Sequence, residues 1–281
     1  FSIPTHGCQV VIPAEANVIS RRVPIPVFGG GLIEAIPDET LLRLADPLDL
    51  DRDGVSGRAA VVEDLATGLP RVGRFGWKAQ HATLLAFGAD AYRNEMGITS
   101  DLFPTEQSFG IDPEVMQLCD PLPDPEDAEE PATGLRGIDN FEAFMKFLAP
   151  LGRGLIDETV LAGERVFEAI GCAVCHVPTI KTGPSANPLF DRRTVPLFSD
   201  LLLHDVASGD GIAQAAAAPN EIRTPALWGL RFRRPLLHDG SAATPTEAVL
   251  AHGAEAELAR AGFEQLDPVS RAALLAFLAS L

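Results

Sequence analysis

The chain has 281 residues, of which 46% are hydrophobic and 22% are charged, so it can form one large or two ordinary globular domains with real cores. Its formal net charge is −17, which argues against nucleic acid or an anionic membrane as a partner and favours a basic protein surface. No window of about 18 uninterrupted apolar residues occurs, so no membrane span is predicted.

The N-terminal segment, residues 1–37, is predicted to be extended and punctuated by prolines. Its triple glycine Gly29–Gly31 lacks the GxGxxG pattern, so we do not predict a dinucleotide loop. A helix is expected to begin near Pro37–Asp38 and to run through "ETLLRLA". Because the chain starts at Phe1 without a signal-peptide pattern, we expect a processed chain or a piece of something longer.

The stretch "DLDRDGVSG" places Asp49, Asp51 and Asp53 at alternate positions before a glycine. Carboxylates at positions 1, 3 and 5 with glycine at 6 match the first half of a calcium loop. Position 12 is Ala60 and not glutamate, so a bidentate ligand has to come from elsewhere, with Glu63 as the candidate. The alternative is an Asx-rich surface turn.

The middle of the chain predicts two helices separated by an acidic, proline-rich linker at residues 119–134. The first, "WKAQHATLLAFGADAYRNEMG", is expected to stop at Gly97, and the second is "NFEAFMKFLAPL". We place the domain boundary near Pro150–Asp157. This division gives an N-terminal scaffold domain, residues 1–150, and a second domain, residues 151–281.

The second domain opens with an amphipathic helix, "DETVLAGERVFEAIG", and closes with the helix "DPVSRAALLAFLASL". Asp267 or Ser270 is the predicted N-cap of the last helix, and Pro268 suits its first turn. Between the two helices, residues 177–243 are expected to be loop-rich with short helical pieces. The predicted fold class is mostly α.

The stretch "GCAVCHVP" contains Cys172, Cys175 and His176. On a helical turn these positions share one face, so two thiols can bond the vinyl groups of a haem while the imidazole reaches the iron. C-x-x-C-H is the attachment pattern of c-type haem. Structural zinc needs four ligands, and a thioredoxin-like redox motif needs a βαβ context, neither of which the sequence offers. We therefore predict one covalently bound haem c.

The other two cysteines, Cys8 and Cys119, form a predicted disulfide if the compartment is oxidising. Two unrelated buried thiols are the alternative reading.

The haem iron has a second axial position, and His176 takes only the first. The chain's methionines all precede the motif, so none of them belongs to the second domain: Met96, Met116 and Met145. The choices left are a ligand from the other domain, an open position that admits peroxide, or one of three histidines: His204, His238 and His252. Ligation by two histidines favours electron transfer alone.

Several stretches resemble the di-haem oxidoreductases, a family of peroxidase-like and thiol oxidoreductase-like proteins related to bacterial di-haem cytochrome c peroxidases. These stretches are "GRFGWKAQHATLLAFGADAYRNEMGIT", "GCAVCHVPTIKTG", "SDLLLHD", "RTPALWGL" and "LLHDGSAATPTEAV". The resemblance covers nearly the whole chain from about Ala14 and implies a peroxidase-like helical scaffold. Gly163, Phe167 and Phe277 add a resemblance to class I cytochrome c, in which the first and last helices cross beside the haem.

This chain departs from the family pattern in two places. Family members carry two haem motifs, and only the second is present here, so Phe1 is expected to start a fragment, a processed chain or a variant without its first haem. In the peroxidase relatives the first haem reacts with peroxide and the second passes electrons to it. At "LLLHDVAS" the family usually has His-Asp-Met-Gly, and here Val206 replaces that methionine, which makes His204 the first candidate for the sixth ligand.

Within "RTPALWGL", Arg223 is expected to pair with a haem propionate, and Trp228 is expected to shield the ring edge or else to pack in the core. Trp77 is expected between the domains.

We expect a periplasmic or otherwise extracytoplasmic c-type cytochrome that moves single electrons. Its partner would be a redox protein with a basic docking face, within a larger complex or a longer chain. The alternative is a peroxidase-like oxidoreductase that acts through an open haem site or with a first haem domain missing from this chain. A third reading is a structural subunit that docks by its acidic face.

Overall fold

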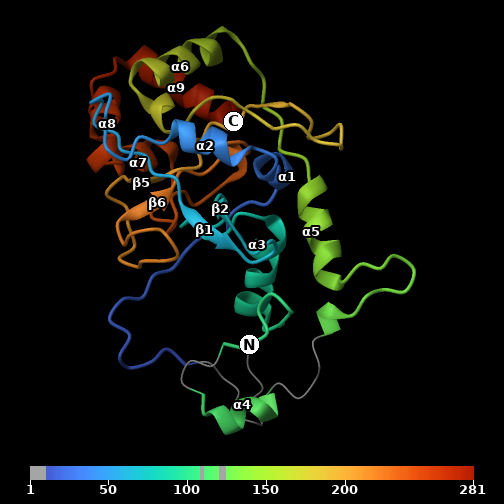
Figure 1. The fold of residues 1–281 in the computed structure, drawn as a ribbon. Helices are drawn as coiled ribbons and strands as arrows, with labels where there is room; N and C mark the ends of the chain where they lie inside the picture. The colour runs from blue at the N-terminus through green and yellow to red at the C-terminus, as the bar shows by residue number, and fades with distance from the viewer. Residues whose placement is uncertain (1–10, 108–110, 120–124) are drawn as a thin grey trace.

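The computed structural model describes residues 11–107, 111–119 and 125–281, and the regular structure of this part is mostly helical (Figure 1). The described residues form nine α-helices: α1 (Gly30–Glu34), α2 (Asp38–Leu44), α3 (Leu84–Ala91), α4 (Pro113–Cys119), α5 (Gly137–Phe147), α6 (Glu158–Ala169), α7 (Pro245–Leu250), α8 (Glu257–Glu264) and α9 (Pro268–Ser280). The predicted mostly-α class is confirmed.

The described residues also form three small antiparallel sheets of two strands each. They pair β1 (Val61–Asp64) with β2 (Leu69–Val72), β3 (Ile180–Lys181) with β4 (Thr194–Val195), and β5 (Leu203–Asp205) with β6 (Glu221–Arg223). Short helices were predicted in the loop-rich region, residues 177–243. The structure has mainly short strands there, and one 3₁₀ turn at Leu230–Phe232.

Local signals set several helix ends as predicted. Asp267 caps α9, since its side chain accepts hydrogen bonds from the amides of Val269 and Ser270. Helix α3 continues directly into a π-helical turn, Tyr92–Met96, and Gly97 ends this turn in the left-handed region, at φ 67°. That helix begins later than predicted, because Thr83 caps α3 and the residues before it are not helical.

The glycine triplet is a site of close packing. A Cβ on Gly31 would lie 2.2 Å from the carbonyl oxygen of Lys146 in α5, and a Cβ on Gly29 would lie 2.4 Å from the Trp228 ring. Gly29 also has φ 77°, which favours glycine. The triplet thus lets α1 approach α5, in agreement with the prediction that it is not a dinucleotide loop.

The larger buried cluster combines side chains from both sides of position 150. It includes Ile36, Leu41 and Leu84 from the first part of the chain and Leu197 and Leu202 from the second. The second cluster lies entirely after position 150 and surrounds the α6–α9 pair. The two halves therefore share a core, and the predicted division into two domains stays a prediction.

Helices α6 and α9 cross closely, as expected from Gly163, Phe167 and Phe277, and Figure 1 shows them side by side. A Cβ on Gly163 would lie 2.0 Å from the carbonyl oxygen of Ala273. The rings of Phe167 and Phe277 have centroids 5.1 Å apart, and Phe198 joins them with its centroid 5.5 Å from that of Phe277. An aromatic cluster therefore fills the crossing.

Within the described ranges, no helix is both long and apolar enough to cross a bilayer. Cys8 lies outside the described residues, so its predicted disulfide with Cys119 stays a prediction.

The crossing predicts that Gly163→Ala destabilises the protein by about 1–3 kcal/mol, because the new methyl group has to push the α9 backbone away. This loss should exceed the helix-propensity gain of Ala over Gly, which is about 1 kcal/mol. Urea unfolding measures the difference. Gly152→Ala is the matched control, since nothing lies within 4 Å of its Cβ position. Equal stability of the two variants would contradict the close crossing.

Candidate haem site

The C-x-x-C-H motif forms a tight turn directly after α6. Gly171, at φ 91°, breaks the helix, and Cys172–Val174 form a 3₁₀ turn. The amide of His176 then donates to the carbonyl oxygen of Cys172 at 3.0 Å. Both cysteines are free thiols, and together with His176 they line one cavity of about 390 Å³. The structure thus brings the three predicted haem residues to one cavity.

The His176 imidazole is oriented by a backbone hydrogen bond. Its Nδ1 lies 3.0 Å from the carbonyl oxygen of Phe198, and Nε2 has no hydrogen bond within the described part of the chain. Backbone bonds from Ser199 to Val177 and from Asp200 to Cys175 hold the Phe198 segment beside the motif. Burial lowers the pKa of His176 to about 4, so the imidazole is neutral and its Nε2 lone pair is free to bind a metal.

The two thiols are protonated at neutral pH. Burial raises the pKa of Cys172 to about 12. Burial also raises the pKa of Cys175, against the opposing effect of its contact with His204. A redox C-x-x-C motif or a zinc site uses thiolates, so these apolar surroundings fit S–H addition to a vinyl group better than either alternative.

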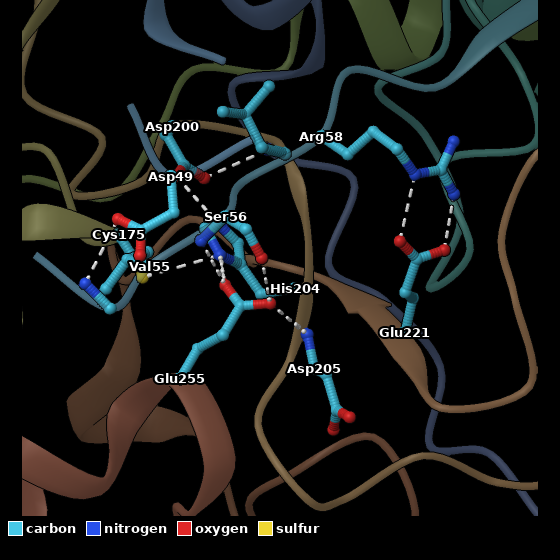
Figure 2. A network of polar contacts seen from close by, with 12 residues as sticks. Asp49, Val55, Ser56, Arg58, Cys175, Asp200, His204, Asp205, Glu221 and Glu255 are labelled. Atoms are coloured by element: carbon cyan, nitrogen blue, oxygen red, sulfur yellow. Dashed lines mark hydrogen bonds and ion pairs between the residues drawn. The ribbon is translucent and has the colours of Figure 1, made fainter. Parts of the chain in front are cut away.

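His204, the first candidate for the sixth ligand, lies between two carboxylates (Figure 2). Its Nε2 is 2.8 Å from Asp200 Oδ2, its Nδ1 is 2.8 Å from Glu255 Oε2, and the ring is 2% exposed. Burial by itself lowers the pKa of His204, but the hydrogen bonds to Asp200, Cys175 and Glu255 outweigh it and raise the pKa to about 12. A charged imidazolium that donates from both nitrogens has no lone pair for iron, so this arrangement does not fit the predicted role.

Cys175, Asp200 and His204 also place one sulfur, one oxygen and one nitrogen within 4.8 Å of one another, as a metal site would. Both imidazole nitrogens are already hydrogen-bonded, so we assign this trio a structural role.

Glu255 ties the cavity to the acidic loop, residues 49–53, through the residue Ser56 that follows it. It accepts hydrogen bonds from the amide and hydroxyl of Ser56, at 3.1 and 3.2 Å, and from the amide of Asp205 at 3.1 Å. Figure 2 shows Glu255 between His204 and Asp205. Asp53 and Val55, just before Ser56, line the cavity. A wall of the site therefore comes from the N-terminal half of the chain.

The other two candidate histidines both line the cavity. His252 Nδ1 lies 2.7 Å from the carbonyl oxygen of Ala248, and Nε2 has no hydrogen bond among the described residues. His238 is 4% exposed, and its buried Nδ1 has no hydrogen-bond partner among the described residues. Its ring packs edge-on against that of Trp77, with the two ring centroids 6.2 Å apart. Val206, the position of the family's methionine, accepts a backbone hydrogen bond from Gly253 and so lies beside His252.

Of the two residues predicted in "RTPALWGL", only Arg223 lines the cavity. Trp228 instead belongs to the larger buried cluster and packs on Gly29, which matches the core alternative. The tryptophan at the cavity is Trp77, whose Nε1 donates to the carbonyl oxygen of Val23 at 2.7 Å. The sequence analysis expected Trp77 between the domains but did not place it at the haem cavity, because its contacts come from distant segments.

The carboxylates of Asp49, Asp51 and Asp53 converge to within 4.8 Å of one another, as a cation site requires. They also accept amide hydrogen bonds, including Gly54 to Asp49 at 3.2 Å and Val55 to Asp53 at 2.8 Å, as an Asx turn does. Glu63 is not in the group. Calcium binding at this loop stays a prediction.

We predict that His204→Leu destabilises the protein by about 3–5 kcal/mol at neutral pH, because it leaves the buried carboxylate of Asp200 and the half-buried carboxylate of Glu255 without their cation. The raised pKa of His204 means that its stabilisation is complete below pH 6.5 and declines as the pH rises toward 12. Urea unfolding at pH 6 and pH 9 should show the difference between wild type and variant shrinking with pH. A constant difference would contradict a charged His204.

No curated protein matches the chain. One similar solved structure is that of a MauG-like protein associated with microbial copper homeostasis, at 18% identity and TM-score 0.42, covering 96% of this chain and 94% of that chain. Another is hydrazine synthase of Kuenenia stuttgartiensis, at 16% identity and TM-score 0.35, covering 97% and 99%. These scores are too low for either likeness to carry an argument.

The family described as "Di-haem oxidoreductase, putative peroxidase" matches residues 12–281, which agrees with the resemblance of the sequence motifs. The chain therefore belongs to the di-haem oxidoreductase family.

Proposed function

We propose that this chain carries one haem c on Cys172 and Cys175 and passes single electrons through it. Each thiol adds its sulfur and its hydrogen across one vinyl group, a step that needs no oxidant. His176 Nε2 provides the first axial ligand. When bound, the haem supplies a one-electron Fe(III)/Fe(II) couple.

The observation that carries this proposal is the matching geometry of two histidines. His176 and His252 line the same cavity, and each has its Nδ1 on a backbone carbonyl oxygen, that of Phe198 or Ala248. Metal-binding histidines commonly donate one ring N–H in this way, which fixes the tautomer and leaves Nε2 free. We therefore assign the sixth position to His252 in place of His204. Two histidine ligands close the iron to peroxide and favour electron transfer.

Membership of the family also supports the peroxidase-like alternative, through an open iron position here or a first haem outside this sequence. The two functions differ in ligation, so the spectrum of the holoprotein separates them.

The α6–α9 crossing beside the motif supports a cytochrome c-like haem domain over residues 151–281. A covalent haem and a Cys8–Cys119 disulfide would both suit a periplasmic or otherwise extracytoplasmic protein. The net charge of −17 supports a redox partner with a basic docking face.

We expect holoprotein made in a host that matures c-type cytochromes to keep its colour after acid–acetone extraction. Its oxidised spectrum should be low-spin, with two histidine ligands. His252→Ala should turn the spectrum high-spin and make it sensitive to peroxide, whereas the control His238→Ala should stay low-spin. A high-spin wild type that reacts with peroxide supports the alternative function, and extractable haem overturns covalent attachment.

For the acidic loop, we expect added calcium to raise the melting temperature of chelator-treated protein through linkage. Asp51→Asn should abolish this rise, because it removes one of the three converging carboxylates. Glu39→Gln, which removes one exposed charge elsewhere, is the control and should keep the rise. A melting temperature that does not respond to calcium leaves only the Asx turn.

A further inference from the structure

Two guanidinium groups line the haem cavity with unused donors. Arg223, which is 3% exposed, donates Nε to the carbonyl oxygen of Gly76 at 2.8 Å and Nη1 to that of Thr224 at 3.0 Å. Arg233 donates Nη1 to the carbonyl oxygen of Ala226 at 3.1 Å. Nη2 of Arg223, and Nε and Nη2 of Arg233, have no partner among the described residues.

Neither arginine forms an ion pair within the described ranges, although Arg223 is buried and Arg233 is half-buried. The fully buried cations Arg74 and Lys78 do have carboxylate partners. Arg74 pairs with Asp38, and Lys78 lies 3.1 Å from Asp210. Burial lowers the pKa of Arg223 to about 10, and the charge of Arg233 contributes to the decrease. Burial lowers the pKa of Arg233 as well. An uncompensated buried charge is costly, so two cations in one cavity call for two negative charges from a ligand.

The carboxylate that acts on Arg223 does not meet this need. Asp200 acts on Arg223 electrostatically, but its oxygens are held by His204 and by the amide of Leu202. The counter-charge for the pair therefore has to come from what fills the cavity.

We propose that Arg223 and Arg233 bind the two propionate carboxylates of the haem, one guanidinium to each. This inference rests on the proposed function, because the same cavity holds Cys172, Cys175 and His176. The planar guanidinium matches a carboxylate through two parallel N–H donors, and each arginine has donors left for one. Arg233 is thereby added to the single arginine that the sequence had indicated.

The test compares holoprotein variants Arg223→Gln and Arg233→Gln with the control Arg234→Gln. Arg234 is exposed, does not line the cavity and bonds only backbone carbonyls. Resonance Raman spectroscopy of the propionate bending bands reports the contact directly, and spectroelectrochemistry gives the midpoint potential. We expect both cavity variants to shift these bands and to have a more negative potential, since losing a nearby positive charge favours ferric iron. The control should match wild type in both.

Arg223→Lys separates charge from geometry: it should keep most of the potential and still shift the bands. If Arg223→Gln does not fold, Arg233→Gln decides the matter by the same two readouts. Unchanged bands and potential in the glutamine variants would overturn the propionate assignment while leaving covalent haem in place. A wild type without covalent haem overturns the proposed function, and the inference with it.

Discussion

The site depends on one hydrogen bond, from His176 Nδ1 to the carbonyl oxygen of Phe198. It fixes which imidazole nitrogen is free, and it links the motif to the fold, because the Phe198 ring packs on Phe167 and Phe277 at the α6–α9 crossing. That crossing exists only because Gly163 lets the two backbones approach. The α6–α9 contact, the aromatic cluster and the orientation of the His176 ring therefore form one unit. A change in the helix contact would change the orientation of the ring.

Around this unit the protein treats its buried charges in different ways. His204 is held between two carboxylates, and the fully buried Arg74 has a carboxylate partner, so each of these groups is neutralised within the chain. Arg223 and Arg233 are the exceptions among the residues that line the cavity. In a chain with 39 acidic side chains, a shortage of anions does not explain this. The unpaired cations are better understood as half of an interaction that the ligand completes.

Local sequence signals predicted much of this structure. C-x-x-C-H, the Asp267 cap and the stop at Gly97 depend on residues close in the chain, and all three agree with the structure. The choice among histidines depends on distant contacts, since one of the two carboxylates that hold His204, that of Glu255, lies 51 residues away in the chain. The residue at Val206 made His204 the first candidate for the sixth ligand from the sequence. We propose His252 in its place, which the backbone hydrogen bond from Gly253 to Val206 sets beside that position. His252 follows α7 and lies four residues after Ala248. This spacing is a local signal in the sequence for the hydrogen bond between its ring and the carbonyl oxygen of Ala248.

The cavity wall joins residues from opposite ends of the chain, with Asp53 and Val55 facing the same space as Leu278 of α9. Leu278 belongs to the helix that Gly163 holds against α6, and α6 leads directly into the cysteine motif. A substitution that displaces α9 would therefore alter the shape of the cavity as well as the stability of the helix pair.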